Sequence, residues 1–215
     1  MTIDYKKTQK HLYQPKTTPE IIDIPEMVFL AIDGKGNPNT SEDYKTAIEI
    51  LYGLSYTIKM SKKTGNEPTG YFDYVVPPLE GLWSLDDGGA FTGGGQVIMD
   101  KDKFLWTAMI RQPEFVTQEV FEEAKLTLSK KKPELDLSKV KLVEFTEGLC
   151  AQVMHIGAYD DEPATIEKLS TFIHSQGYVE DMTGSRNHHE IYLGDPRKSA
   201  PEKLKTVLRH PIKIK

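Results

Sequence analysis

The sequence of 215 residues is poor in cysteine and has no long apolar run. Its one cysteine, Cys150, cannot form an internal disulfide, and no Cys/His spacing is typical of a zinc site. No apolar stretch approaches the roughly 20 residues that are needed to cross a bilayer. The N-terminus, MTIDYKKTQK, lacks the apolar core of a signal peptide. We therefore expect a cytoplasmic protein that has no membrane partner.

Clustered positive charge is also scarce. The formal net charge is −5, and the lysines and arginines form no long block. A nucleic-acid-binding protein usually carries a clustered positive face, because phosphate contacts dominate its affinity. The composition therefore argues against a nucleic-acid partner.

Common cofactor and catalytic motifs are missing as well. The segment GGAFTGGG lacks the Lys-Ser/Thr pair of a phosphate loop, and GKGNPN lacks the third glycine of a dinucleotide-binding turn. There is no GxSxG elbow and no HExxH helix. His188 and His189 are adjacent, so on a strand they would point to opposite faces and could not share a metal ion. The sequence thus predicts neither a metal site nor a cofactor.

What the chain does contain is enough apolar material for one core, with 38% hydrophobic residues. Residues 1–20 are polar and predict an N-terminal arm, whereas 21–215 predict a single domain. Hydrophobic periodicity predicts strands at 27–34, 103–112, 140–147, 149–156 and 188–193. Similar patterns predict helices at 40–64, 117–131 and 163–176. A capping box formed by Ser199 and Glu202 predicts a short C-terminal helix.

The order of these elements suggests an internal repeat. MVFLAIDG, a loop, a helix and extended pieces are matched later by AQVMHIGAY, a loop, a helix and HHEIYL, with Gly34 and Gly157 in corresponding places. We therefore predict an α+β fold with two strand–helix–strand–strand halves, at about 26–111 and 115–195, that form one antiparallel sheet. A ligand cleft is expected at the seam between the halves.

The strand HHEIYL carries the clearest chemical signal. Alternation places His188, Glu190 and Tyr192 on one face, opposite Ile191 on the other. In one interpretation the polar face is simply solvated. In the other it lines a cleft, where a partly desolvated carboxylate would favour cationic ligands or act as a general base.

Aromatic residues are the second signal. Core packing explains most of them, but tyrosines on a helix flank that face two tryptophans would also form a box for a flat or cationic ligand. The candidates are Tyr52 and Tyr56 on the helix, and Tyr71, Phe72, Tyr74, Trp83 and Trp106 in the extended segments.

Five ordered blocks resemble the GyrI-like proteins in their stand-alone form. These blocks are IDGKGNPN, AIEILYGLSYTIKM, PLEGLW, MIRQPEFVT and HHEIYLGDPRKSAPEKLKTVLR, and the match runs from about Tyr5 to about Pro211. The resemblance implies paired repeats around a ligand cleft. In regulators of the MerR and AraC types, a similar domain senses lipophilic compounds beside a DNA-binding domain, for which this chain has no room.

The resemblance also implies roles for individual residues. The family's acidic residue corresponds to Glu190, and its aromatic cleft residues correspond to Tyr56, Trp83, Trp106 and Tyr192. Some stand-alone members hydrolyse the strained cyclopropane ring of DNA-alkylating natural products. Ser84 stands where a second aromatic residue is common, and Glu80 is a second acidic candidate.

Three functions follow as hypotheses. The protein could bind or sequester lipophilic, aromatic and cationic molecules, could hydrolyse an electrophilic small molecule in the same cleft, or could inhibit a protein partner. The first two share their residues and need a small-molecule partner only. The expected catalytic residues are Glu190 with Tyr56 or Tyr192, and the expected ligand-binding residues are Trp83, Trp106, Tyr52, Tyr71, Glu80 and His188.

Overall fold

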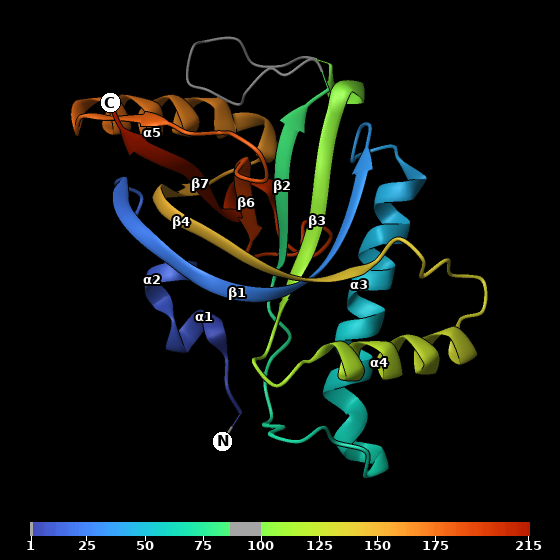
Figure 1. Ribbon diagram of the computed structural model, residues 1–215. Helices are drawn as coiled ribbons and strands as arrows, with labels where there is room; N and C mark the ends of the chain where they lie inside the picture. Colours follow the sequence, from blue (N-terminus) through green and yellow to red (C-terminus); the bar gives the residue numbers. More distant parts are fainter. Residues whose placement is uncertain (1, 87–99) are drawn as a thin grey trace.

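The computed structural model describes residues 2–86 and 100–215, and its centre is an antiparallel sheet that closes on itself (Figure 1). The glycine-rich segment 88–95 lies outside the described residues. The strands of the closed sheet are β1 (Glu20–Lys35), β2 (Leu79–Leu85), β3 (Phe104–Gln112), β4 (Lys141–Ile156), β6 (His188–Tyr192) and β7 (Lys205–Ile214). The short β5 (Tyr178–Glu180) pairs with the end of β7.

Closure of the sheet is the main feature that the sequence did not predict. The strand order is β4–β1–β3–β2–β6–β7, and β7 pairs again with β4, which makes a barrel of six strands. The expected α+β class with an antiparallel sheet is confirmed. A closed sheet has no exposed edge, so each of these strands has a neighbour on both sides.

The two long strands β1 and β4 curve across the barrel (Figure 1). Their pairing is interrupted at Pro25 and Glu147, where the proline has no N–H to donate. Gly148 next to this point has a φ of 71°, a left-handed conformation that glycine adopts without strain. Residues 140–147 and 149–156, predicted as two strands, are therefore one bent strand.

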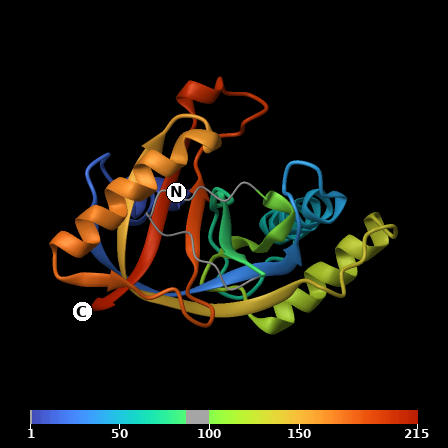
Figure 2. The same cartoon turned by 90° about the horizontal axis from the view of Figure 1, so that it is seen from above.

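The longer helices lie outside the barrel, with α3 (Glu42–Met60) and α4 (Gln118–Lys131) on one side and α5 (Glu162–Ser175) on another (Figure 2). Helix α3 begins after Ser41, whose side chain accepts a hydrogen bond from the Tyr44 N–H. Its buried face recurs at helical spacing and packs on β1 and β3: Tyr44, Ala47, Leu51, Leu54 and Ile58. None of the described helices is long and apolar enough to span a membrane.

The prediction of a short C-terminal helix is wrong. Residues Pro201–Lys203 form a single 3-10 turn, η4, and Lys205–Ile214 form strand β7. Residues 206–212 are buried on both faces of the strand, and Pro211 would interrupt a helix at that point. Strand β7 lies between β4 and β6 and closes the barrel.

The N-terminal segment is not a free polar arm. It forms two single-turn helices, α1 (Tyr5–Thr8) and α2 (Lys10–Tyr13), and Tyr5, Leu12 and Tyr13 are buried in the core cluster of the barrel. Arg209 Nη2 donates to the Leu12 carbonyl at 2.9 Å, which ties the segment to β7. Its three large buried side chains and this hydrogen bond anchor the segment to the barrel.

The chain contains the order strand–helix–strand–strand twice, as β1–α3–β2–β3 and as β4–α5–β6–β7 with the short β5 inserted. The second set ends with β7, beyond the predicted limit at residue 195. The superposition of 26–111 on 115–195 stays a prediction.

Candidate active site

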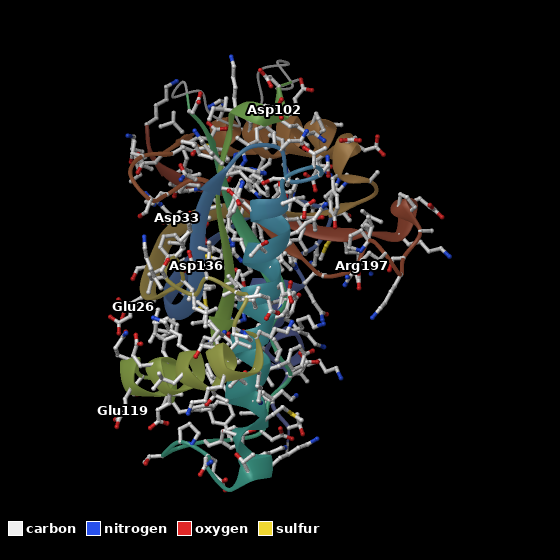
Figure 3. The ribbon with its side chains drawn as sticks, turned by 90° about the vertical axis from the view of Figure 1, so that its right-hand side faces the viewer. Glu26, Asp33, Asp102, Glu119, Asp136 and Arg197 are labelled. Atoms are coloured by element: carbon white, nitrogen blue, oxygen red, sulfur yellow. The ribbon has the colours of Figure 1, made fainter. Side chains whose placement is uncertain are left out.

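A cleft of about 1560 Å³ lies between α3 and the start of α5, and strands β2 and β6 contribute its floor. The segment that follows β6 lines one side of the opening, where Arg197 projects from the body of the molecule (Figure 3). The lining side chains that carry the argument below are Tyr44, Tyr52, Trp83, Glu162, Glu190 and Tyr192.

A continuous chain of hydrogen bonds runs through strand β6 into this cleft. His210 Nε2 and His188 Nδ1 are 2.8 Å apart, and His188 Nε2 lies 3.0 Å from Glu190 Oε1. The Tyr192 hydroxyl donates to Glu190 Oε2 at 2.5 Å, and Trp83 Nε1 donates to the Tyr192 hydroxyl at 3.0 Å. The predicted alternation therefore brings His188, Glu190 and Tyr192 together on one face.

This arrangement fixes the Glu190 carboxylate while leaving it open to a ligand. The Glu190 side chain is 13% exposed, whereas His188 behind it is fully buried. His188, predicted as a ligand-binding residue, therefore does not line the cleft and contacts Glu190 instead. Burial and the Glu190 charge hold the pKa of Tyr192 well above its ordinary value, so the phenol keeps its proton at neutral pH. Glu190 thus has two neutral or cationic donors behind it and free lone pairs toward the cleft.

A glycine makes the bond between Trp83 and Tyr192 possible. Gly81 lies opposite Glu190 in the β2–β6 register. A Cβ atom on Gly81 would come within 2.7 Å of Trp83 Nε1 and 3.3 Å of the Tyr192 hydroxyl. The bare backbone at this position leaves room for the indole to reach across the strand pair.

The two tryptophans, which pair across β2 and β3, have different positions. Trp83 lines the cleft, and its ring centroid is 5.8 Å from that of Tyr44. Trp106 is buried behind Tyr44, at a centroid distance of 4.9 Å, and is not among the lining residues. Its ring lies on Gly34, where a Cβ atom would come within 2.2 Å. The structure therefore places Trp106 in the core that supports the cleft wall.

The helix tyrosines lie further out. Tyr52 and Tyr56 both line the cleft and stack with a centroid distance of 6.3 Å, but Tyr56 is 52% exposed. Of the two tyrosines predicted as catalytic, Tyr192 is the one whose hydroxyl contacts Glu190.

Two other predicted residues lie away from the cleft. Glu80 is on the opposite face of the sheet, inside the barrel, with His189 Nε2 at 2.9 Å from its Oε2 atom. The Tyr71 hydroxyl donates to the Lys59 carbonyl at 2.7 Å, and its ring packs on Phe115. Neither residue lines the cleft, because alternation turns Glu80 inward and Tyr71 packs near the C-terminal end of α3.

The structure adds a residue that the sequence did not indicate. Glu162, the first residue of α5, lines the cleft beside Glu190. Burial first, and then the neighbouring Glu190 charge, hold the pKa of Glu162 well above its ordinary value. In the sequence it resembles any acidic residue in a helix first turn, and only its burial distinguishes it.

Tyr159 also lines the cleft, and its ring meets that of Tyr192 edge-on at 5.7 Å. Burial and the charge of Glu162 raise its pKa to about 12, so this hydroxyl is a neutral donor. Within residues 2–86 and 100–215, no group of three or more His, Cys, Asp or Glu side chains is placed to hold a metal ion.

The antiparallel barrel with an aromatic, acidic cleft on its outer side defines a small-molecule-binding protein. The chain belongs to the family of the GyrI-like small molecule binding domain, whose model matches residues 17–213. No curated protein matches the chain.

Solved structures of similar proteins agree with this assignment. An uncharacterized conserved protein from Listeria innocua has 48% identity and a TM-score of 0.91, with 99% of this chain and 100% of that chain covered. A structure described as a hydrolase from Listeria innocua has 47% identity and a TM-score of 0.88 over the same shares. The EcmrR C-terminal domain shares the fold at 11% identity, with a TM-score of 0.52, 92% of this chain and 98% of that chain covered.

Proposed function

We propose that the cleft binds lipophilic molecules with aromatic rings, including cationic ones, and that the protein hydrolyses an electrophilic member of this class. The observation that carries the proposal is the Glu190 carboxylate, held by His188 and Tyr192 in an aromatic cleft. The description of a relative with 47% identity as a hydrolase supports it.

The residues that line the cleft explain which ligands it would recognise. The rings of Tyr44, Tyr52 and Trp83 provide flat apolar surface for an aromatic ligand. Glu190 supplies negative charge where water is largely displaced, and a cationic group on the ligand therefore gains more there than at an exposed acid. Neutral aromatic molecules would use the rings alone.

Catalysis would use the same carboxylate as a base. A strained three-membered ring conjugated to a carbonyl group, as the family resemblance implies, is already close to reaction. Glu190 takes a proton from a bound water, and the water oxygen forms a bond to a ring carbon. One carbon–carbon bond of the ring breaks, and its electron pair moves through the conjugated system to the carbonyl oxygen. The protein supplies orientation and proton transfer, and this reaction requires no oxidant or reductant.

Binding without turnover is the second candidate function. The stacked Tyr52 and Tyr56 at the outer part of the cleft favour it, since they enlarge the flat apolar surface without contacting Glu190. A protein of this kind would sequester a toxic compound.

The test uses a spirocyclopropyl cyclohexadienone as substrate, with a chelator present and the hydrated product measured by chromatography. We expect the wild-type protein to form product and Glu190→Gln to be slower by about 10²–10⁴-fold. Glu119→Gln is the control, because this exposed acid lies on α4, well away from the segment that carries Arg197 (Figure 3). Binding without product in the wild type would leave the sequestering function, and undiminished product in Glu190→Gln would contradict the role of Glu190.

A further inference from the structure

Glu162 is placed unlike an ordinary acid in the first turn of a helix. Such acids are usually exposed and interact favourably with the helix dipole. Glu162 is only 5% exposed, although it lines the cleft. Its Oε1 atom is buried and has no hydrogen-bond partner within the described residues. Burying a polar atom without a partner is costly, so this position calls for an explanation other than helix stability.

The surroundings of Glu162 favour its protonated form. The charged groups that act on it are Glu190 on β6 and Asp160 on η3 (Tyr159–Asp161), and both are negative. The other polar groups that face it are the phenols of Tyr159 and Tyr192 and the Thr206 hydroxyl on β7. Thr206 favours the ionised form of Glu162, but burial and the two negative charges outweigh it. Two neighbouring carboxyl groups in a partly dry site cannot both ionise easily, and the more buried one keeps its proton.

We propose that Glu162 is the catalytic acid of the cleft: it holds a proton beside the Glu190 carboxylate and delivers it to an oxygen atom of the bound molecule. This role rests on the proposed hydrolysis. The Glu162 side chain lines the cleft, and its buried Oε1 atom has no protein partner among the described residues that would hold the carboxyl group back when it turns toward the bound molecule.

The proton balance of the reaction requires such a group. When water attacks the strained ring, Glu190 gains a proton and the carbonyl oxygen gains an electron pair. Glu162 protonates that oxygen and becomes a carboxylate, and the product is the neutral hydroxyethyl phenol. Glu190 then returns its proton to Glu162 directly or through one water, which restores both carboxyl groups. The net reaction is the addition of one water molecule to the substrate.

Tyr192 is less suited to this step. Its hydroxyl already donates to Glu190 Oε2 at 2.5 Å, and its pKa lies well above the ordinary value for tyrosine. A carboxylic acid with a raised pKa donates a proton more readily than a phenol whose pKa is raised further. Tyr192 instead serves to orient the Glu190 carboxylate.

Two measurements on wild type, Glu162→Gln and Glu162→Asp test the proposal. Infrared spectra at neutral pH should show a protonated carboxyl band in the wild type that Glu162→Gln lacks. With the spirocyclopropyl cyclohexadienone, Glu162→Gln should lower kcat by about 10²-fold with little change in KM, and the loss of wild-type activity at high pH should disappear. Glu162→Asp should recover part of the kcat, since it keeps an acid with a shorter reach.

The matched control is Glu119→Gln, an exposed first-turn acid of α4, which should change neither the band nor kcat. An unchanged kcat in Glu162→Gln, with active wild type, would overturn the role of Glu162 and leave hydrolysis intact. No product from the wild type would overturn hydrolysis and this role with it. An infrared spectrum that is the same in wild type and Glu162→Gln would show that Glu162 carries no proton to donate.

Discussion

Strand β6 carries two fully buried histidines, one on each face of the sheet, and their environments differ. On the barrel face, His189 lies between two carboxylates, with Nε2 at 2.9 Å from Glu80 and Nδ1 at 3.0 Å from Glu147. Arg209 Nη1 also contacts Glu147, at 3.0 Å. On the cleft face, His188 contacts Glu190, and a second acid, Glu162, lies alongside.

The balance of charge differs between the two faces. Burial opposes the ionisation of Glu147, but His189 and Arg209 outweigh it and lower the pKa of Glu147 to about 2. Burial likewise opposes the charge on His189, yet Glu147 and Glu80 raise the pKa of His189 to about 9. Glu162 has no such partner, and its pKa moves upward instead. On the barrel face each buried charge meets a charge of opposite sign, whereas Glu162 on the cleft face has only negative charges acting on it.

The largest expected effect comes from breaking the barrel network. Glu147→Gln removes the carboxylate that both His189 and Arg209 contact, and it leaves two buried cations with one acid between them. Removing one partner of a buried ion pair typically costs about 3–5 kcal/mol. Urea unfolding should show a loss of that size. A loss below about 1 kcal/mol would mean that the network contributes little to stability.

The same network predicts a loss of stability at alkaline pH. The folded-state pKa of His189, about 9, lies above its ordinary value of about 6.5. Its contribution is therefore fully present below about pH 6.5 and is lost as the pH rises through about 9, by about 3 kcal/mol in all. Unfolding free energies between pH 6 and pH 10 test this, together with an NMR titration of the His189 ring. A ring that titrates near 6.5 would contradict it.

A smaller loss of stability is expected when Gly81, which lies next to the Trp83–Tyr192 hydrogen bond, is replaced. Gly81→Ala would force Trp83 or Tyr192 to move, because the new methyl group would lie 2.7 Å from Trp83 Nε1. Overpacking of this kind typically costs about 1–3 kcal/mol. Thermal unfolding and tryptophan emission should both change. Wild-type stability with an unchanged emission spectrum would show that the Trp83–Tyr192 hydrogen bond does not need a glycine at this position.

The smallest expected effect is a gain in stability rather than a loss. In the unfolded chain Glu162 loses its proton above its ordinary pKa of about 4.5, whereas in the folded protein it keeps the proton to a higher pH. Glu162 therefore lowers the free energy of unfolding more and more as the pH rises from about 4.5 toward the folded-state pKa. Glu162→Gln should therefore stabilise the protein at pH 7, by about 1 kcal/mol. The gain should be larger at pH 8 than at pH 5 in thermal unfolding. A variant less stable than the wild type at pH 8 would show that the Glu162 carboxylate, like Glu147, has a stabilising partner in the folded protein.

The cleft face of β6 could be predicted from the sequence, since alternation alone separates Glu190 and Tyr192 from Ile191. Barrel closure could not, because it depends on β7 pairing with both β4 and β6 across long separations. The position of Glu162 depends on how α5 packs against those same strands. Alternation along β2 places Glu80 on the face opposite Trp83, so the prediction of Glu80 in the cleft overlooked a signal that the sequence contains. Trp106 pairs with Trp83, and the sequence does not reveal that it lies deeper.

The affinity of an aromatic cation for the wild type and for Glu190→Gln tests the central claim most directly. Tetraphenylphosphonium carries a charge but no ionisable proton, and triphenylphosphine oxide is a neutral compound with similar rings. Quenching of tryptophan emission would report both, since Trp83 lines the cleft. We predict that Glu190→Gln weakens binding of the cation by about 1.5–3 kcal/mol and leaves the neutral compound nearly unchanged. Equal losses for the two compounds, or no binding of either, would contradict the account of the cleft as a ligand site centred on Glu190.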